Sequence, residues 1–230
     1  ELDGRSSSVA AFLESSYTDG FCVVHRGALV AEQYYNGMNA HSLHLVQSVS
    51  KSVTATALGI LAGRGELQLD ALVTHYLPEL AATAYRGATI QQVLDMTSGV
   101  YWDEDYTAPD SHCAKMDVAA GWKARRNPDW PACMWELILT LQQARGPHGQ
   151  DFSYRSIETD VLGFVLERVA GMPLAELVSR ELWMPMGAAE DACYTVDPAG
   201  FACACGGFNA TLRDLARFGL LYATDGGARG

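Results

Sequence analysis

The segment that begins at Ser48 restricts the fold of this chain more than any other. From Ser48 to about residue 61, apolar residues recur at the spacing of one helical face, which predicts an amphipathic helix packed on a core. Gly63 and Gly65 then end the segment. Lys51 follows Ser48 by three residues, so the two side chains would lie one helical turn apart on the same face. The apolar positions are Val49, Val53, Ala57, Ile60 and Leu61.

A serine beside a lysine at the start of a helix has two interpretations. A serine hydroxyl becomes a good nucleophile when a neighbouring base takes its proton, and a partly buried, deprotonated lysine is such a base. The positive end of the helix dipole would also favour the negative charge that develops there. Ser48 and Lys51 therefore indicate an acyl-transfer site, the only Ser-x-x-Lys match in a chain whose lysines are Lys51, Lys115 and Lys123. The alternative is an ordinary helix-capping serine followed by a solvated lysine.

The remaining patterns predict one β-hairpin near the start of the chain and a mostly helical body. Two β-rich runs, 21–25 and 28–35, flank the turn residues Arg26 and Gly27. Because a hairpin is unstable by itself, further strands are expected to complete its sheet. Helices are predicted at residues 7–15, 90–96, 134–144, 174–182 and 211–222, and after Ser156 up to Gly171.

Residues 100–131 show little periodicity and are rich in Trp, Tyr and Asp. An unpatterned loop of this length in a compact domain is usually functional. Aromatic rings with acidic groups between them would suit a pocket for a substrate that carries an amine. The alternative is a covering loop whose aromatic side chains only pack on the domain.

Composition and charge argue against several classes of protein. The 230 residues carry a formal net charge of −11, which disfavours nucleic acid or an anionic membrane surface as a partner. No run approaches the ~18 consecutive apolar residues of a membrane span. Residues 1–4 do not begin a signal sequence, although a cleaved one would leave no trace. The length allows one large domain or two small ones.

The cysteines and histidines give only weak signals for disulfides or metals. None of the six cysteines forms a Cys-x-x-Cys pair, and Cys203 and Cys205 have no histidine nearby. Reduced thiols in a cytoplasmic protein are favoured over disulfides, which an even count still permits. His41 and His44 lack a third ligand, so packing or solvent contact is favoured over a metal site. No metal and no cofactor is expected.

Four features together resemble the serine β-lactamase and penicillin-binding-protein superfamily, in particular its class C-like members. Further stretches resemble a branch of it that hydrolyses linear amides of the nylon-oligomer kind. The likeness covers nearly all 230 residues. It implies an α+β fold of the β-lactamase/penicillin-binding-protein type, in which residues 1–47 begin an antiparallel sheet flanked by helices and residues 48–230 form a mostly helical region. The four features are Ser48-Val49-Ser50-Lys51, Leu94-Asp95-Met96-Thr97-Ser98-Gly99, Tyr154-Arg155-Ser156, and the connection with Leu69-Asp70 and Tyr76-Leu77-Pro78-Glu79.

The resemblance also implies roles for individual residues. Ser48 resembles the acylated nucleophile, Lys51 its general base, and Tyr154 the tyrosine that passes protons to the leaving amine. Tyr106 resembles a loop tyrosine that closes over bound substrate and hydrogen-bonds the scissile amide nitrogen. Asp117 occupies the place of an acidic residue that faces the free amine of the substrate.

Two departures from the family pattern matter. Cys205, Gly206 and Gly207 stand where the relatives have Asn-Gly-Gly near the substrate, which makes Cys205 a candidate substrate-binding residue and leaves the preference for linear amides open. The family's third motif, Lys-Thr-Gly or a His-containing version on a late strand, is absent, as are the strands beside residues 21–35. We therefore expect residues 1–230 to be the front part of the enzyme. Association with the remaining C-terminal segment as a separate chain stays open, as does a homodimer.

Three activities remain open after this comparison. The resemblance favours a serine hydrolase that cleaves a linear amide in a small-molecule substrate with a free amine. A carboxylesterase acting on short-chain esters would share every catalytic residue. An inactive ligand-binding or sensor protein could use the same fold. A β-lactamase is less favoured, because the acidic aromatic loop suits a cationic amine better than a β-lactam carboxylate.

Overall fold

The computed structural model of the chain describes residues 8–226, which form two compact units. The hairpin unit combines the described residues up to His44 with Pro185–Ala192 and the described residues from Asn209 onwards. The helical unit combines Leu45–Met184 and Cys193–Phe208. Every residue that the sequence implicates in catalysis or substrate binding belongs to the helical unit.

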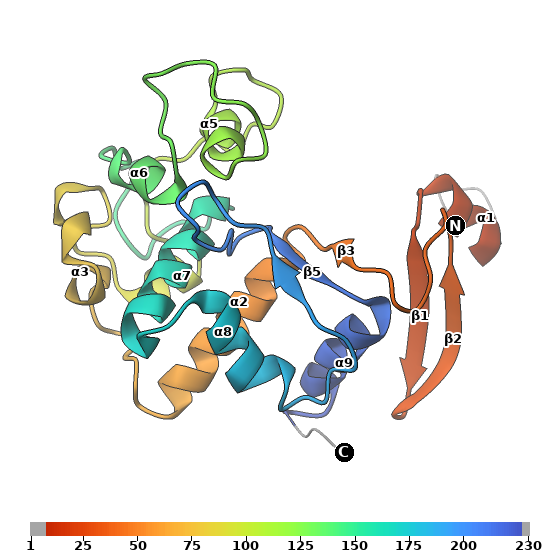
Figure 1. Ribbon diagram of the computed structural model, residues 1–230. Helices are drawn as coiled ribbons and strands as arrows, with labels where there is room; N and C mark the ends of the chain where they lie inside the picture. Colours follow the sequence, from red (N-terminus) through yellow and green to blue (C-terminus); the bar gives the residue numbers. More distant parts are fainter. Residues whose placement is uncertain (1–7, 227–230) are drawn as a thin grey trace. The chain divides into compact units, whose positions relative to one another are not determined.

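The hairpin unit is built on two antiparallel strands, β1 (Gly20–His25) and β2 (Ala28–Tyr34), as the sequence predicts (Figure 1). Arg26 and Gly27 between them both have positive φ angles, of 51° and 81°. Such a two-residue turn matches the right-handed twist of the flanking strands, which explains the tight connection. Helix α1 (Val9–Ser15) precedes the hairpin, also as predicted.

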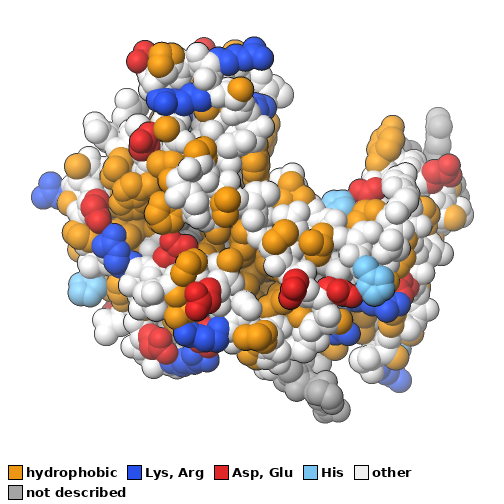
Figure 2. Space-filling view, in the orientation of Figure 1, with side chains coloured by type: hydrophobic (Ala, Val, Ile, Leu, Met, Phe, Trp, Pro, Cys, Tyr) orange, Lys and Arg blue, Asp and Glu red, His pale blue; other side chains and the backbone are white. Residues whose placement is uncertain are grey.

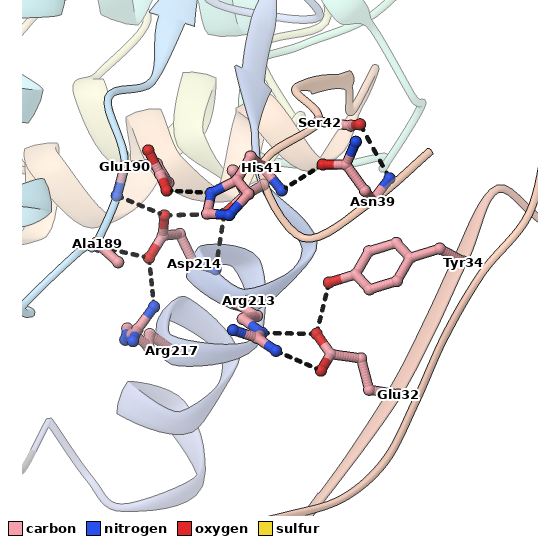
Figure 3. A network of polar contacts seen from close by, with 11 residues as sticks. Glu32, Tyr34, Asn39, His41, Ser42, Ala189, Glu190, Arg213, Asp214 and Arg217 are labelled. Atoms are coloured by element: carbon pink, nitrogen blue, oxygen red, sulfur yellow. Dashed lines mark hydrogen bonds and ion pairs between the residues drawn. The ribbon is translucent and has the colours of Figure 1, made fainter. Parts of the chain in front are cut away.

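Helix α9 (Leu212–Ala223) packs against β1 in the same unit. Its Arg213 donates to both carboxylate oxygens of Glu32 on β2, each at 2.7 Å (Figure 3). The adjacent Asp214 is fully buried and accepts two backbone N–H groups of the Pro185–Ala192 stretch, at 2.8 and 3.1 Å. These bonds join three separate stretches of the chain into one unit.

Two long helices form the centre of the helical unit. Helices α2 (Val49–Gly63) and α7 (Ser156–Ala170) pack against each other, and both were predicted (Figure 1). Helix α7 ends at Gly171, whose φ of 65° is a left-handed conformation that glycine adopts without strain. The buried apolar side chains of the two helices include Val53, Ala57, Leu58, Leu61, Val161, Leu162, Val165 and Leu166.

Shorter helices surround this pair, and three of them differ from the prediction. The helix predicted at 90–96 ends at Leu94. The predicted helix 134–144 ends at Leu139, and the residues after it form an antiparallel bridge in which the Gln143 carbonyl accepts the Tyr101 N–H at 2.8 Å. The predicted helix 174–182 consists of an α-helical segment followed by a π-helical one. The shorter elements are α3 (Val73–Tyr76), η1 (Pro78–Ala82), α4 (Ile90–Leu94), α6 (Met134–Leu139), α8 (Leu174–Val178) and η2 (Ser179–Trp183).

The predicted unpatterned loop at residues 100–131 contains a further helix, α5 (His112–Ala119), which the sequence analysis missed. Its eight residues mix polar and apolar types without a clean stripe, so it shows no helical period. The sequence feature that indicates its start is the N-cap residue Ser111, whose side chain accepts the Ala114 N–H at 3.0 Å.

A second sheet has the strand order β3 (His44–Leu45), β5 (Phe208–Ala210), β4 (Cys193–Tyr194). Strands of two or three residues are too short to show an alternating pattern, and the sequence analysis did not predict them. The predicted α+β class is confirmed, since helices are combined with small sheets.

The surface of the described residues carries charged side chains of both signs, as expected from the 16 basic and 27 acidic residues of the sequence. On the face shown in Figure 2, basic side chains are interspersed with acidic ones. Within residues 8–226, every helix is too short or too polar to cross a membrane.

Candidate active site

Ser48 lies directly before the first residue of α2, and its backbone is already helical, with φ −64° and ψ −9°. Its side chain makes no capping hydrogen bond to the helix. Instead, its Oγ lies 2.9 Å from the Nζ of Lys51, one turn further along α2. Ser48 therefore does not act as a side-chain cap, and its hydroxyl is paired with an amine.

Lys51 is held by two more groups besides Ser48. Its Nζ donates to the carbonyl oxygen of Cys205 at 2.8 Å and lies 5.1 Å from the centre of the Tyr154 ring. The lysine is half-buried, so its position is set by these contacts rather than by solvent. Once deprotonated, an amine in this position can accept the proton of the Ser48 hydroxyl.

The segment of residues 203–207 places the carbonyl group that binds Lys51. It lies along α2, where Thr54 donates to the Ala204 carbonyl at 3.2 Å. One turn earlier on α2, the hydroxyl of Ser50 accepts the Phe208 N–H at 3.1 Å. Two hydroxyl groups of the same helix thus fix both ends of the segment.

Two glycines allow this segment to approach its neighbours. A Cβ added to Gly163 on α7 would lie 2.9 Å from the Cβ of Ala204. A Cβ added to Gly207 would lie 2.4 Å from Thr195 Oγ1 and 2.8 Å from the Cys203 carbonyl oxygen. All three distances are shorter than real side chains permit, so the two positions need glycine for reasons of space.

The backbone just before Ser48 is strained. Gln47 has a φ of 47°, a left-handed conformation that costs a non-glycine residue about 1–2 kcal/mol. The N–H of Ser48 makes no hydrogen bond within residues 8–226. An open N–H at the positive end of α2, beside Ser48 Oγ, is a donor of the kind that an oxyanion needs.

Tyr154 lies two residues before α7 and exposes 39% of its surface. Its neighbour Arg155 is buried and donates to the Met96 carbonyl at 2.9 Å and to Glu158 at 3.4 Å. Burial raises the pKa of Glu158 to about 7. These contacts fix the backbone after Tyr154 and leave the ring at the surface beside Lys51.

Glu104 ties the loop of residues 100–131 to the start of α7. Its carboxylate accepts the N–H of Ser156 at 3.0 Å and the Ser156 hydroxyl at 2.5 Å. It also accepts the indole N–H of Trp102 and, at 2.5 Å, the hydroxyl of Tyr106. Burial and the hydrogen bond to Glu104 raise the pKa of Tyr106, although most of the residue is exposed. The structure thus places the Tyr106 hydroxyl on this anchor.

Asp117 lies on α5, and its carboxylate is 2.7 Å from the Nζ of Lys123. The Trp122 N–H and the Lys123 N–H both donate to the Asp117 carbonyl, at 2.9 and 3.0 Å. The Trp122 indole reaches Gly206, where an added Cβ would lie 3.3 Å from the ring. The turn after α5 therefore brings Lys123 to the Asp117 carboxylate and Trp122 to the segment that carries Cys205.

Cys205 is buried, and burial raises the pKa of its thiol well above the ordinary value. The contact that it makes at the site comes from its backbone carbonyl. Its N–H donates to the Asp160 side chain of α7 at 3.2 Å. A contact between the Cys205 side chain and a substrate stays a prediction.

Sequence reasoning missed three residues of the site. Asp160 was readable as one of two acidic residues, with Glu158, in the otherwise mostly apolar first half of α7. Glu104 was readable as an acid between two aromatic residues, Trp102 and Tyr106. Trp122 gave no signal that separates it from the other tryptophans of the loop.

The histidines singled out by the sequence pair with carboxylates in the hairpin unit. His41 lies 2.6 Å from Glu190 (Figure 3), and His44 lies 2.9 Å from Asp19. Within residues 8–226, no group of three or more His, Cys, Asp or Glu side chains is arranged to hold a metal ion. The absence of a cofactor stays a prediction.

The chain resembles known proteins over most of its length. The family model described as Beta-lactamase matches residues 9–229. The 6-aminohexanoate-dimer hydrolase of Paenarthrobacter ureafaciens is 42% identical over 219 residues, which cover 95% of this chain and 55% of that protein. Esterase EstB of Burkholderia gladioli is 32% identical over 175 residues, which cover 72% of this chain and 42% of that protein.

Solved structures show the same likeness. The structure described as "Putative 6-aminohexanoate-dimer hydrolase from Bacillus anthracis" has a TM-score of 0.91 at 32% identity and covers 99% of this chain and 59% of that one. The octameric penicillin-binding protein homologue from Pyrococcus abyssi has a TM-score of 0.75 at 18% identity, which shows the fold alone. The chain spans about half the length of the curated relatives it matches.

Proposed function

Because the chain belongs to the beta-lactamase family, we propose that it supplies the reactive part of a serine hydrolase that cleaves a linear amide through an acyl-enzyme on Ser48. The observation that carries the proposal is the 2.9 Å contact between Ser48 Oγ and Lys51 Nζ. A hydroxyl beside an amine, at the start of a helix, is the arrangement that activates a serine nucleophile. The Cys205 carbonyl supports it by holding the amine in place.

The reaction takes two steps. In the first, Lys51 takes the proton of Ser48 as Oγ bonds to the carbonyl carbon, and the Ser48 N–H stabilises the oxyanion. Tyr154 then passes a proton to the amide nitrogen, the C–N bond breaks, and the amine leaves with the acyl group on Ser48. In the second step, water adds to this ester and gives a proton to the Tyr154 oxygen, the bond between the acyl carbon and Ser48 Oγ breaks as the acid leaves, and Lys51 returns its proton to Ser48.

The proposed substrate is an amide of the 6-aminohexanoate-dimer kind, with a free amine. Asp117 would bind the ammonium group, and the Tyr106 hydroxyl would leave Glu104 to approach the scissile nitrogen. The 42% identity to the 6-aminohexanoate-dimer hydrolase of Paenarthrobacter ureafaciens supports this substrate class.

A fluorophosphonate probe tests the nucleophile. We expect one label per chain on Ser48, no label on Ser48→Ala, and labelling of Lys51→Met that is slower by about 10²–10⁴-fold, the usual contribution of a general base. Intact-mass spectrometry measures the label. A folded parent protein that takes up no label would instead be a ligand-binding or sensor protein.

A matched pair of substrates tests the role of Asp117. The p-nitroanilides of 6-aminohexanoate and of hexanoate differ only in the ammonium group, and the parent should prefer the first. Asp117→Asn should remove this preference without lowering turnover of the neutral anilide. If Asp117→Asn leaves the preference intact, its assigned role is wrong.

A carboxylesterase is the second candidate, and the ion pair of Asp117 with Lys123 favours it. A carboxylate that already holds an ammonium group is less open to a substrate amine. The 32% identity to esterase EstB points the same way. In that case p-nitrophenyl butyrate should be turned over faster than the 6-aminohexanoate dimer and both anilides, and Asp117→Asn should have no effect on any of them.

A further inference from the structure

Asp160 is a buried carboxylate that the proposed chemistry does not use. It lies on α7 and is 2% exposed. Its Oδ1 accepts the N–H of Cys205 at 3.2 Å, while its Oδ2 has no hydrogen-bond partner within residues 8–226. Burying a carboxylate with an unsatisfied oxygen is costly, so its presence calls for an explanation.

The Cys205 peptide group connects Asp160 with the reactive pair. Its N–H donates to Asp160, and its carbonyl accepts from Lys51 Nζ at 2.8 Å. The same Nζ lies 2.9 Å from Ser48 Oγ. A negative charge behind the N–H makes the carbonyl a stronger acceptor, because hydrogen bonds in a chain polarise one another.

The titratable groups that face Asp160 are consistent with an electrostatic link between Asp160 and Lys51. Burial raises the pKa of Asp160 to about 6, against the opposing effects of Cys205 and of the Lys51 charge. The other titratable groups that face it are the thiols of Cys203 and Cys205 and the hydroxyl of Tyr85, and burial raises the pKa of each. These three groups stay neutral near pH 7, so among the groups that face Asp160 only Lys51, when it is protonated, brings a positive charge that lowers the Asp160 pKa.

We propose that Asp160 is a positioning residue that holds Lys51 beside Ser48 through the Cys205 peptide group. It touches neither the substrate nor the reacting atoms. The inference rests on the proposed function, in which Ser48 is the nucleophile and Lys51 the base. A purely structural role would change stability and leave the Lys51 side chain as it is.

Two substitutions separate the charge of Asp160 from its hydrogen bond. Asp160→Asn keeps an oxygen that can accept the Cys205 N–H and removes the charge, whereas Asp160→Ala removes both. Glu167→Gln is the matched control. Glu167 also lies on α7 and accepts a backbone N–H, that of Leu174 at 2.8 Å, at a distance of two turns from Asp160.

The Lys51 side chain itself provides the readout. With ¹⁵N- and ¹³C-labelled lysine, only three side chains give signals, and Lys51→Met identifies that of Lys51. In Asp160→Asn, the Lys51 side chain should lose its proton at a pH lower by about half a unit or more, because a nearby anion has been removed. Glu167→Gln should leave this titration unchanged.

The rate of fluorophosphonate labelling is the second readout. In Asp160→Ala, labelling of Ser48 should slow by about 10–100-fold, the usual effect of removing a group that orients a reactive one. Circular dichroism checks that each variant is folded, and Asp160→Asn decides the question if Asp160→Ala is not. Folded variants whose Lys51 titration and Ser48 labelling equal those of the parent would overturn the proposal.

The two readouts also distinguish this inference from the proposed function. The lysine spectra do not depend on turnover. If the parent takes up no label but the Lys51 titration moves in Asp160→Asn, the proposed function fails and the positioning role stands. If the parent is labelled and neither readout changes in the variants, the positioning role fails and the proposed function stands.

Discussion

The carboxylate of Asp117 is occupied by another residue of the chain. Lys123 Nζ lies 2.7 Å away, and the Lys123 side chain is 62% exposed. An ion pair with an exposed partner contributes about 0–1 kcal/mol. Breaking the pair of Asp117 with Lys123 would therefore cost a substrate ammonium group little free energy. At the scale of single residues, Lys123 is therefore a competitor of any cationic substrate that binds at Asp117.

Replacing Lys123 with glutamine should strengthen the binding of amine-bearing substrates. We expect the KM for 6-aminohexanoyl p-nitroanilide to fall by about two- to fivefold in Lys123→Gln, the range that an exposed ion pair allows. The KM for hexanoyl p-nitroanilide should not change. Lys115→Gln, on the helix that carries Asp117, makes the same change in net charge and serves as the control. Equal effects of the two variants would contradict the competition.

At the scale of elements, the start of α7 depends on a side chain from another segment. The first N–H groups of a helix have no partner within the helix. Glu104 supplies an acceptor for that of Ser156 and, at the same time, accepts from Trp102 and Tyr106. One carboxylate thus stabilises the helix end next to Tyr154 and the position of the loop.

Loss of the Glu104 carboxylate should lower the stability of the protein. In Glu104→Ala, the free energy of unfolding should fall by about 1–3 kcal/mol, because partly buried N–H donors lose their acceptor. Urea denaturation measures this change. Asp110→Ala, an exposed acid in the same loop, should stay within about 0.5 kcal/mol of the parent. A similarly small change in Glu104→Ala would show that the loop is held by other contacts.

The link between β2 and α9 in the hairpin unit should depend on pH. Chiefly through its hydrogen bonds, Arg213 lowers the pKa of Glu32 from the ordinary 4.5 to about 2. A lowered pKa in the folded state adds stability that is complete well above pH 4.5 and is lost as the pH falls to about 2.

Glu32→Gln should therefore lower the melting temperature at pH 7, and the difference from the parent should shrink steadily between about pH 5 and pH 2. Differential scanning calorimetry over this range measures it. Glu14→Gln, on the exposed surface of α1, is the control. A difference that does not vary with pH would show that the Glu32 contribution comes from packing.

At the scale of the whole molecule, the net charge of −11 should attract cationic substrates over a distance. Raising the ionic strength from about 10 mM to about 1 M shortens the screening length from about 30 Å to about 3 Å. The value of kcat/KM for 6-aminohexanoyl p-nitroanilide should fall over this range, while that for hexanoyl p-nitroanilide should not. Parallel salt curves for the two anilides would contradict this attraction.

Sequence reasoning identified the local parts of the fold and of the site. Ser48 and Lys51 lie three residues apart in one amphipathic helix, so their pairing follows from helical geometry. The partner that holds Lys51 lies 154 residues further along the chain, in a segment of small residues without any period. Periodicity reports the face of an element that is buried, whereas contacts between distant segments depend on how the elements pack. For the same reason, Asp160 and the strands of two or three residues could not be placed.

The contact of Trp122 with Gly206 gives the protein a natural optical probe. The emission of an indole ring depends on the polarity around it, and this ring is partly open to solvent, next to the segment whose Cys205 carbonyl binds Lys51. A molecule that settles there changes the fluorescence without any added dye. Trp122→Phe would isolate this signal from that of the other four tryptophans, so that the arrival of a ligand can be followed in real time.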